Sequence, residues 1–295
     1  MQIKANGLTL EVEVSGPADG EPILLIMGLG MQLTAWPDAL LQTLAGSGFR
    51  TIVFDNRDIG LSTHFDAWGR PNLGIASFRL AFGMRIRTPY LLADMARDAT
   101  GVLDALRLDR VHVLGVSMGG MIAQHLAIDA PARVKSLTLM MTTSGARHLP
   151  GPTLRARRAL LSRPGARNID GLVEHSMRVL RAIGSTAYPN DDTTLRARLE
   201  RSIRRSYHPQ GMARHLVAVA ASGDRSPLLS RIGHPTLVIH GRDDPLVPVA
   251  CGIDLANKIP GARLELIDGM GHDLPPGLVP RLAELIIAHS AQPAR

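Results

Sequence analysis

The sequence predicts an α/β protein with a mostly parallel sheet that is covered by helices on both faces. Short apolar runs typical of buried strands alternate with stretches of helical length and periodicity. The 295 residues are 45% hydrophobic, which provides enough apolar surface for one large domain core. Only residues 146–223 break the alternation, because they contain helical stretches and no buried strand. We therefore expect a core of residues 1–145 and 224–295, with a helical cap inserted at 146–223.

The first half of the chain contains five predicted strands. Residues 8–15 alternate apolar and polar side chains, which indicates a half-exposed strand at an antiparallel edge. The other four are continuous apolar runs, as in buried parallel strands, at 22–27, 51–54, 111–114 and 134–141. Helices are expected at 37–45, at 89–106 with Thr88 and Pro89 at its start, and directly after residue 117, whereas 64–88 is expected to be irregular.

The second half begins with the predicted cap. Four stretches within it have helical character, at 155–161, 172–183, 193–205 and 211–221. The alternation of the core then resumes, with strands expected at 236–240 and 263–267 and helices at 249–259 and 279–289.

The net charge of +7 is concentrated in one region. Residues 146–225 contain 15 Arg, no Lys and six acidic residues, so the rest of the chain has 18 basic and 20 acidic residues. We interpret the arginines as a solvated helical surface. The alternative is attraction of an anionic substrate or an acidic membrane surface.

Several classes of protein are not expected from the composition. The sequence has no zinc-ligand spacing and no basic helix with interleaved aromatic residues, so we expect no nucleic-acid partner and no metal. It has no signal-peptide pattern and no apolar run of about 18 residues, which predicts a cytoplasmic protein without a membrane partner. The single cysteine, Cys251, cannot form an intramolecular disulfide and is interpreted as a core residue.

The stretch Val111–Gly120 carries the main chemical signal. A buried strand leads into Gly115-Val116-Ser117-Met118-Gly119, and a helix follows at once. This G-x-S-x-G pattern between a strand and a helix is typical of a tight turn that exposes a nucleophilic serine. We therefore expect Ser117 to be a nucleophile, and an acid and a histidine to follow it in the chain.

Candidates for both partners follow later predicted strands. Asp243 and Asp244 leave the end of the strand at 236–240, where a carboxylate can orient an imidazole. His272 follows the last strand on the glycine-rich loop Gly269-Met270-Gly271, in the required order after Ser117 and the acids. His112, His125 and His240 lie in predicted strands or helices and are interpreted as packing or hydrogen-bonding residues.

These motifs resemble those of the α/β-hydrolase superfamily across nearly the whole chain outside the cap. The resemblance rests on Met27-Gly28-Leu29, Asp55–Ser62, Gly115–Gly119 and the pair Asp244 and His272. Within this superfamily, the motifs are most similar to those of the group that contains aclacinomycin methylesterase and related bacterial esterases. The resemblance implies an eight-stranded sheet with a helical cap, and it selects Asp244 over Asp243, because a proline follows four residues later at 248.

The resemblance also implies an oxyanion hole made by the backbone N–H groups of Leu29 and Met118. Met27, Gly28, Leu29 and Met118 would then line the substrate pocket. Many members have His-Gly where this chain has Met27-Gly28, so a side chain that often braces the loop is missing. The turn Asp55–Ser62 is interpreted as structural.

The implied activity is hydrolysis of a small carboxylic ester through an acyl-enzyme, without a cofactor. Ser117 would attack, His272 would act as general base and then acid, and Asp244 would orient His272. A C–C bond hydrolase, a lactonase and a cofactor-free perhydrolase would use the same triad. A ligand-binding receptor that retains the fold is a further alternative.

Overall fold

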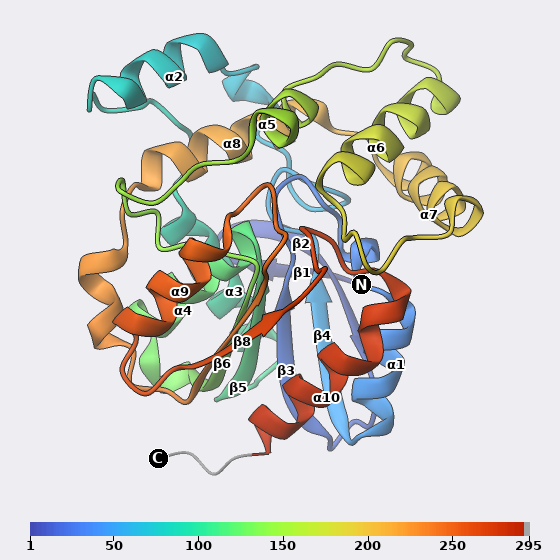
Figure 1. Cartoon of the computed structure of the whole chain (residues 1–295). Coiled ribbons are helices and arrows are strands. Elements are labelled where there is room, and N and C mark those ends of the chain that lie inside the picture. Colours follow the sequence, from blue (N-terminus) through green and yellow to red (C-terminus); the bar gives the residue numbers. More distant parts are fainter. Residues whose placement is uncertain (292–295) are drawn as a thin grey trace.

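The computed structural model describes residues 1–291 and confirms a mostly parallel sheet covered by helices on both faces (Figure 1). Within these residues the sheet has eight strands in the order β1-β2-β4-β3-β5-β6-β7-β8. The pairs β1-β2 and β2-β4 are antiparallel, and all the other neighbouring pairs are parallel. The strands are β1 Gln2–Ala5, β2 Leu8–Ser15, β3 Glu21–Ile26, β4 Phe49–Phe54, β5 Val111–Val116, β6 Val134–Met140, β7 Thr236–Gly241 and β8 Arg263–Ile267.

Helices cover the two faces of this sheet as separate layers. Helices α1 (Asp38–Gly46) and α10 (Val279–Ser290) pack on one face. Helices α3 (Leu92–Ala105), α4 (Met118–Asp129) and α9 (Val249–Lys258) pack on the other. Strands β5 and β7 are buried along their whole length, which agrees with their continuous apolar sequences and with helices on both sides.

The segment 146–223, between β6 and β7, is helical. It forms α5 (Leu154–Leu160), α6 (Ile169–Ile183), α7 (Asp192–Arg205) and α8 (Pro209–Ser222). Figure 1 shows these helices above the sheet, beyond the carboxyl ends of the parallel strands. A small cluster of apolar residues from α6 and α7, including Val173, Met177 and Leu195, is separate from the two layers of the main core.

Three local expectations were wrong. Residues 8–15 form β2, which was expected at the edge of the sheet, but β2 lies between β1 and β4. The edge strand is β1, whose four residues are too few to be recognised from the sequence. Residues 64–88 are not irregular throughout, because they include helix α2 (Leu73–Ala81), with the Asn72 side chain capping its first turn. Helix α3 begins at Leu92 instead of residue 89, since the Asp94 carboxylate accepts a hydrogen bond from the Leu91 N–H at 2.7 Å.

Two further properties bear on the sequence analysis. No helix within residues 1–291 is long and apolar enough to cross a bilayer. The last four residues of the expected second core segment, 292–295, lie outside the described part of the chain.

Candidate active site

Ser117 lies in the sharp turn between β5 and α4, as the G-x-S-x-G pattern predicts. Its backbone has φ 55° and ψ −120°, a left-handed conformation that strains a residue other than glycine. The turn is held by a hydrogen bond from the Ser117 N–H to the Met140 carbonyl at 2.9 Å. A side chain at Gly115 would overlap the Gly119 carbonyl, and one at Gly119 would overlap the Ile26 carbonyl. Both flanking glycines are therefore required by close backbone packing.

The structure brings the three candidate catalytic side chains into one chain of hydrogen bonds. His272 Nε2 lies 2.9 Å from Ser117 Oγ, and His272 Nδ1 lies 2.7 Å from Asp244 Oδ2. The other oxygen of Asp244 accepts from the N–H groups of Leu246 and Val247 at 2.9 and 2.8 Å. These hydrogen bonds to both oxygens fix the orientation of the Asp244 side chain toward the imidazole.

Asp243, the other acid in this loop, forms no hydrogen bond or ion pair with His272 in the described residues. Its side chain is exposed and accepts a long hydrogen bond of 3.3 Å from the Thr186 hydroxyl. His240 lies beneath the same loop, fully buried, and its Nε2 contacts the Val247 carbonyl at 2.7 Å. Burial lowers the pKa of His240, so it remains neutral and packs as expected for a hydrogen-bonding core residue.

The loop that carries His272 is fixed by the helical segment 146–223. The His272 N–H donates to the Ile183 carbonyl at the end of α6 at 2.7 Å. The Ser185 hydroxyl accepts from the Gly271 N–H at 2.9 Å and donates to the Asp273 carboxylate at 2.6 Å. A side chain at Gly271 would overlap the backbone of residue 184. The second glycine of Gly-Met-Gly-His therefore allows α6 to approach the histidine.

The loop after β3 lies beside Ser117. A Cβ added at Gly28 would meet Ser117 Cβ at 3.2 Å, so the backbone there passes close to the candidate nucleophile. Among residues 1–291 neither the Leu29 N–H nor the Met118 N–H donates a hydrogen bond within the protein. Both candidate oxyanion donors are therefore free to bind a ligand oxygen.

Residues from other parts of the chain hold the loop after β3, where Met27 provides no bracing side chain. The Asn56 amide donates to the Met27 carbonyl at 3.0 Å, and the Leu33 N–H donates to Asp55 Oδ1 at 2.7 Å. The Gly30 N–H donates to Nδ1 of His215, a completely buried residue of α8, at 3.3 Å. The loop is thus held from the turn Asp55–Ser62 and from α8.

The same turn forms buried ion pairs with the helical segment 146–223. Arg214 donates to both oxygens of Asp58 at 2.8 and 2.7 Å, and the Tyr90 hydroxyl donates to Asp58 at 2.6 Å. Arg205 contacts Asp55 Oδ2 at 2.7 Å. Burial would raise the pKa of Asp58, but the hydrogen bonds from Arg214 and its neighbours hold that pKa below its usual value.

These contacts correct the interpretation of the arginines as a solvated surface for three of the fifteen residues, whereas most of the others are exposed. Arg214 and Arg225 are almost completely buried, and Arg205 is largely buried. Arg225 donates to the Gln124 side chain and to the Thr143 carbonyl. Arg205 and Arg214 fix the helical segment to the sheet-forming part of the chain, and Arg225, just after the segment, binds the Gly223 carbonyl at its end. Sequence periodicity alone could not separate these three from the exposed arginines around them.

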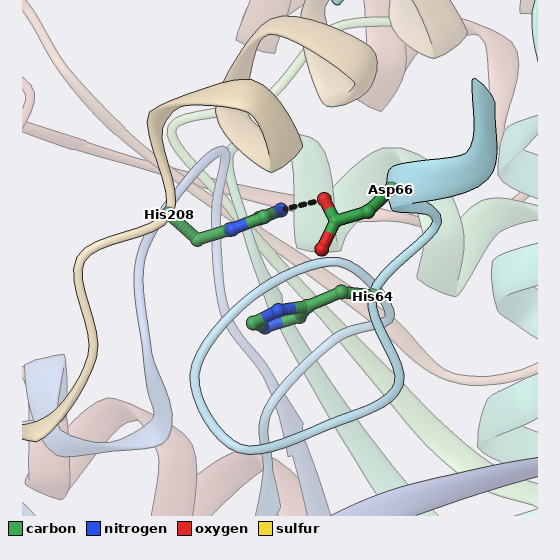
Figure 2. A group of neighbouring side chains, drawn as sticks. All are labelled: His64, Asp66 and His208. Carbon is green, nitrogen blue, oxygen red and sulfur yellow. Dashed lines mark ion pairs between the residues drawn. The ribbon is translucent and has the colours of Figure 1, made fainter. Parts of the chain in front are cut away.

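A second polar cluster, shown in Figure 2, consists of His64, Asp66 and His208. One ligand atom from each lies within 4.8 Å of the others. The two imidazole rings, however, are stacked at 3.9 Å with an angle of 14°, so their in-plane lone pairs run parallel and do not converge on one ion. In addition, Arg214 Nη2 lies 2.9 Å from His208 Nε2. This geometry suits an ion-paired contact between the turn and α8 and does not suit a metal site.

Comparisons with known proteins agree with this architecture. A sequence model described as the alpha/beta hydrolase fold matches residues 21–275. Rhodomycin D methylesterase of Streptomyces sp. strain C5 is 31% identical, over 94% of this chain and 93% of its own. The 2-hydroxy-6-oxononadienedioate/2-hydroxy-6-oxononatrienedioate hydrolase of Cupriavidus pinatubonensis strain JMP 134 is 29% identical, over 86% and 81%. The crystal structure of the enol-lactonase from Burkholderia xenovorans LB400 superposes with a TM-score of 0.75 at 20% identity, over 99% and 100% of the two chains. The family match spans most of the sequence and is supported by a relative above 30% identity, so this chain belongs to the alpha/beta hydrolase fold family.

Proposed function

We propose that this protein is a serine hydrolase that cleaves carboxylic esters through an acyl-enzyme. The observation that carries the proposal is the continuous hydrogen-bond chain from Ser117 Oγ through His272 to Asp244, with distances of 2.9 and 2.7 Å. These distances are within the range at which a general base removes a proton from a nucleophile.

Acylation begins when Ser117 Oγ attacks the ester carbonyl carbon and its proton passes to His272 Nε2. The carbonyl oxygen becomes an oxyanion and accepts hydrogen bonds from the N–H groups of Leu29 and Met118. Asp244 stabilises the imidazolium and keeps the second proton on Nδ1. When the tetrahedral intermediate collapses, the C–O bond breaks and Nε2–H protonates the departing alcohol oxygen.

Deacylation repeats the sequence with water. His272 removes a proton from a water molecule as its oxygen attacks the acyl carbon, and the same two amides hold the oxyanion. Collapse returns the proton to Ser117 Oγ and releases the carboxylic acid. All the groups needed for this cycle are side chains and amides of this chain.

We further propose that residues 146–223 act as a cap domain over the site, with residues 1–145 and 224–295 forming the catalytic core. This division is supported by the contact of α6 with the His272 loop and by the position of α8. A Cβ added at Gly30 would meet the side chain of Met212 on α8 at 2.8 Å, so this helix closes over the oxyanion loop. Met27, Leu29 and Met118 would form the core side of an apolar substrate pocket.

The test is a turnover assay with methyl and ethyl esters of acids of increasing length, because the relative at 31% identity is named a methylesterase. We expect acid release by the wild-type protein and stoichiometric labelling of Ser117 by an activated phosphonate, located by mass spectrometry. The Ser117→Ala variant is the matched control. Ester turnover that survives in this variant, or labelling at another residue, would contradict the proposal.

A second candidate is hydrolysis of a carbon–carbon bond. The relative from Cupriavidus pinatubonensis is named for a substrate with two carboxylates, an enol and a ketone and no ester, so its hydrolysis must break a C–C bond. The same triad geometry serves that reaction. Incubation with a vinylogous 1,5-diketone decides between them: release of a carboxylic acid and a dienol, without ester turnover, would favour the second candidate.

A further inference from the structure

Two segments of the chain carry positive charge without any acidic residue. Residues 67–93 and 146–169 together contain ten arginines and no Asp, Glu or Lys, and we refer to them as the arginine surface. Their arginines are Arg70, Arg79, Arg85, Arg87, Arg147, Arg155, Arg157, Arg158, Arg163 and Arg167.

The charge of the arginine surface is not neutralised within the protein. Nine of its arginines are exposed and Arg79 is partly exposed. No ion pair within residues 1–291 includes any of the ten. The acids that flank the first segment are already paired, Asp66 with Arg214 and Asp94 with Arg97. The surface therefore presents a cationic field to the solvent.

The same segments expose an unusual number of large apolar side chains. Helix α2 contributes no buried residue to the core, although its sequence is largely apolar. Phe78 and Phe82 pack against each other with ring centroids 4.6 Å apart, and both are more than half exposed. The exposed apolar side chains of the arginine surface are Trp68, Ile75, Phe78, Leu80, Phe82, Met84, Leu91, Leu154 and Leu161.

The two segments lie on one side of the molecule. Figure 1 shows α2 and α5 in the upper part of the molecule, away from α1 and α10. A cavity of about 1030 Å³ is lined from both segments, by Met84, Arg85 and Arg87 of the first and by Arg147 of the second. The two segments therefore meet at this cavity, and each of them presents both apolar and cationic side chains to the solvent.

We propose that the arginine surface docks this protein onto anionic lipid bilayers. Exposed aromatic and aliphatic side chains can enter the interface between headgroups and acyl chains, while the guanidinium groups bind lipid phosphates. A symmetric dimer through this surface would place one set of ten unpaired arginines against another, which disfavours a second copy as the occupant. The apolar side chains also distinguish the surface from a purely electrostatic site for nucleic acid.

The two tryptophans provide an internal probe. Trp36 is 1% exposed in the core, whereas Trp68 is 57% exposed on the arginine surface. In the experiment, the full-length protein is mixed with large vesicles of phosphatidylcholine alone or of phosphatidylcholine with about 30% phosphatidylglycerol, an anionic lipid. Co-sedimentation measures binding, and the emission maximum reports the surroundings of Trp68. We expect binding to the anionic vesicles only, with a blue shift that is lost as salt is raised.

A charge variant and a matched control test which arginines act. Replacing Arg155, Arg157 and Arg158 of α5 with Gln should weaken vesicle binding about 100-fold, at about fivefold per arginine near the surface. The control removes three charges from α7 by replacing Arg196, Arg201 and Arg204 with Gln. These side chains are similarly exposed but form ion pairs, so we expect little change in binding.

An apolar variant tests insertion. Phe78→Ser with Phe82→Ser should reduce binding and the blue shift without changing the thermal unfolding midpoint, since both side chains are exposed. Equal binding to neutral and anionic vesicles, an equal effect of the α5 and α7 variants, or no binding would overturn the proposal. So would a dimer in lipid-free solution that the phenylalanine variant dissociates, because the surface would then be a protein interface.

Discussion

Replacing His215 with Gln should flatten the acid side of the stability profile. His215 is completely buried on α8, and its Nε2 contacts the Arg57 carbonyl at 2.7 Å while Nδ1 accepts from the Gly30 N–H. Both contacts require a neutral ring with its hydrogen on Nε2. Glutamine keeps an amide donor for the Arg57 carbonyl but does not titrate, so the variant removes the proton linkage with little change in volume.

The magnitude follows from the pKa of His215. Burial lowers this pKa from 6.5 to about 4, despite the hydrogen bond to the Arg57 carbonyl and the nearby charge of Asp58. The unfolded chain therefore binds a proton at a higher pH than the folded chain does. The stability is fully present above pH 6.5 and is lost as the pH falls through 4. At ~1.4 kcal/mol per pH unit, the loss reaches ~2.5 kcal/mol at pH 4.5 and ~3 kcal/mol below pH 4.

The assay is urea unfolding followed by circular dichroism at several pH values between 7.5 and 4.5. The other histidines with lowered pKa values, such as His112 and His289, titrate in both proteins and cancel in the comparison. The wild-type protein should lose ~2.5 kcal/mol more than His215→Gln over this interval. Parallel profiles for the two proteins would show that His215 is protonated in the folded state or hydrated, and the reasoning would be refuted.

Three other predictions concern the site and its supports. Ser117→Ala should lower kcat on the order of 10⁶-fold while leaving the unfolding midpoint intact or slightly raised, since it removes the nucleophile; a smaller loss in ester turnover assays would point to another residue. Asp244→Asn should lower kcat about 10⁴-fold, whereas exposed Asp243→Asn should change it less than about threefold; the reverse order in steady-state kinetics would reassign the acid. Arg214→Gln should destabilise the protein by about 3–5 kcal/mol, because Asp58 would keep a buried charge without its partner, and the exposed Arg204→Gln should cost less than about 1 kcal/mol in the same denaturation assay.

The candidate catalytic side chains, which the structure brings together, could be picked out from the sequence because they have local signals. Ser117 is flanked by glycines that close packing demands, and His272 follows a glycine that makes room for α6. Asp244 could not be separated from Asp243 by residue chemistry alone, and only the spacing to Pro248 favoured it. The structure supplies the physical difference, since Asp244 is buried against backbone N–H groups and Asp243 is exposed.

The supports of the site could not be predicted, because they depend on contacts between distant parts of the chain. Arg214 and Asp58 are 156 positions apart, and nothing in the local sequence distinguishes Arg214 from the exposed arginines of the same segment. His215 likewise resembles any other helical histidine until its two hydrogen bonds are seen. Helix α2 was missed for a different reason, since it has only nine residues and buries none of them against the core.

The contacts of the helical segment 146–223 limit how it can be exchanged. It holds the His272 loop through Ser185, and it holds the loop after β3 through His215. It also neutralises Asp58 through Arg214. A chimera that transplants this segment from a relative would therefore misalign the loop of His272 and the loop after β3, and it would leave a buried acid unpaired. A successful exchange would have to include the turn Asp55–Ser62 together with the helices. The part of the chain that must be exchanged as one piece is therefore discontinuous in the sequence.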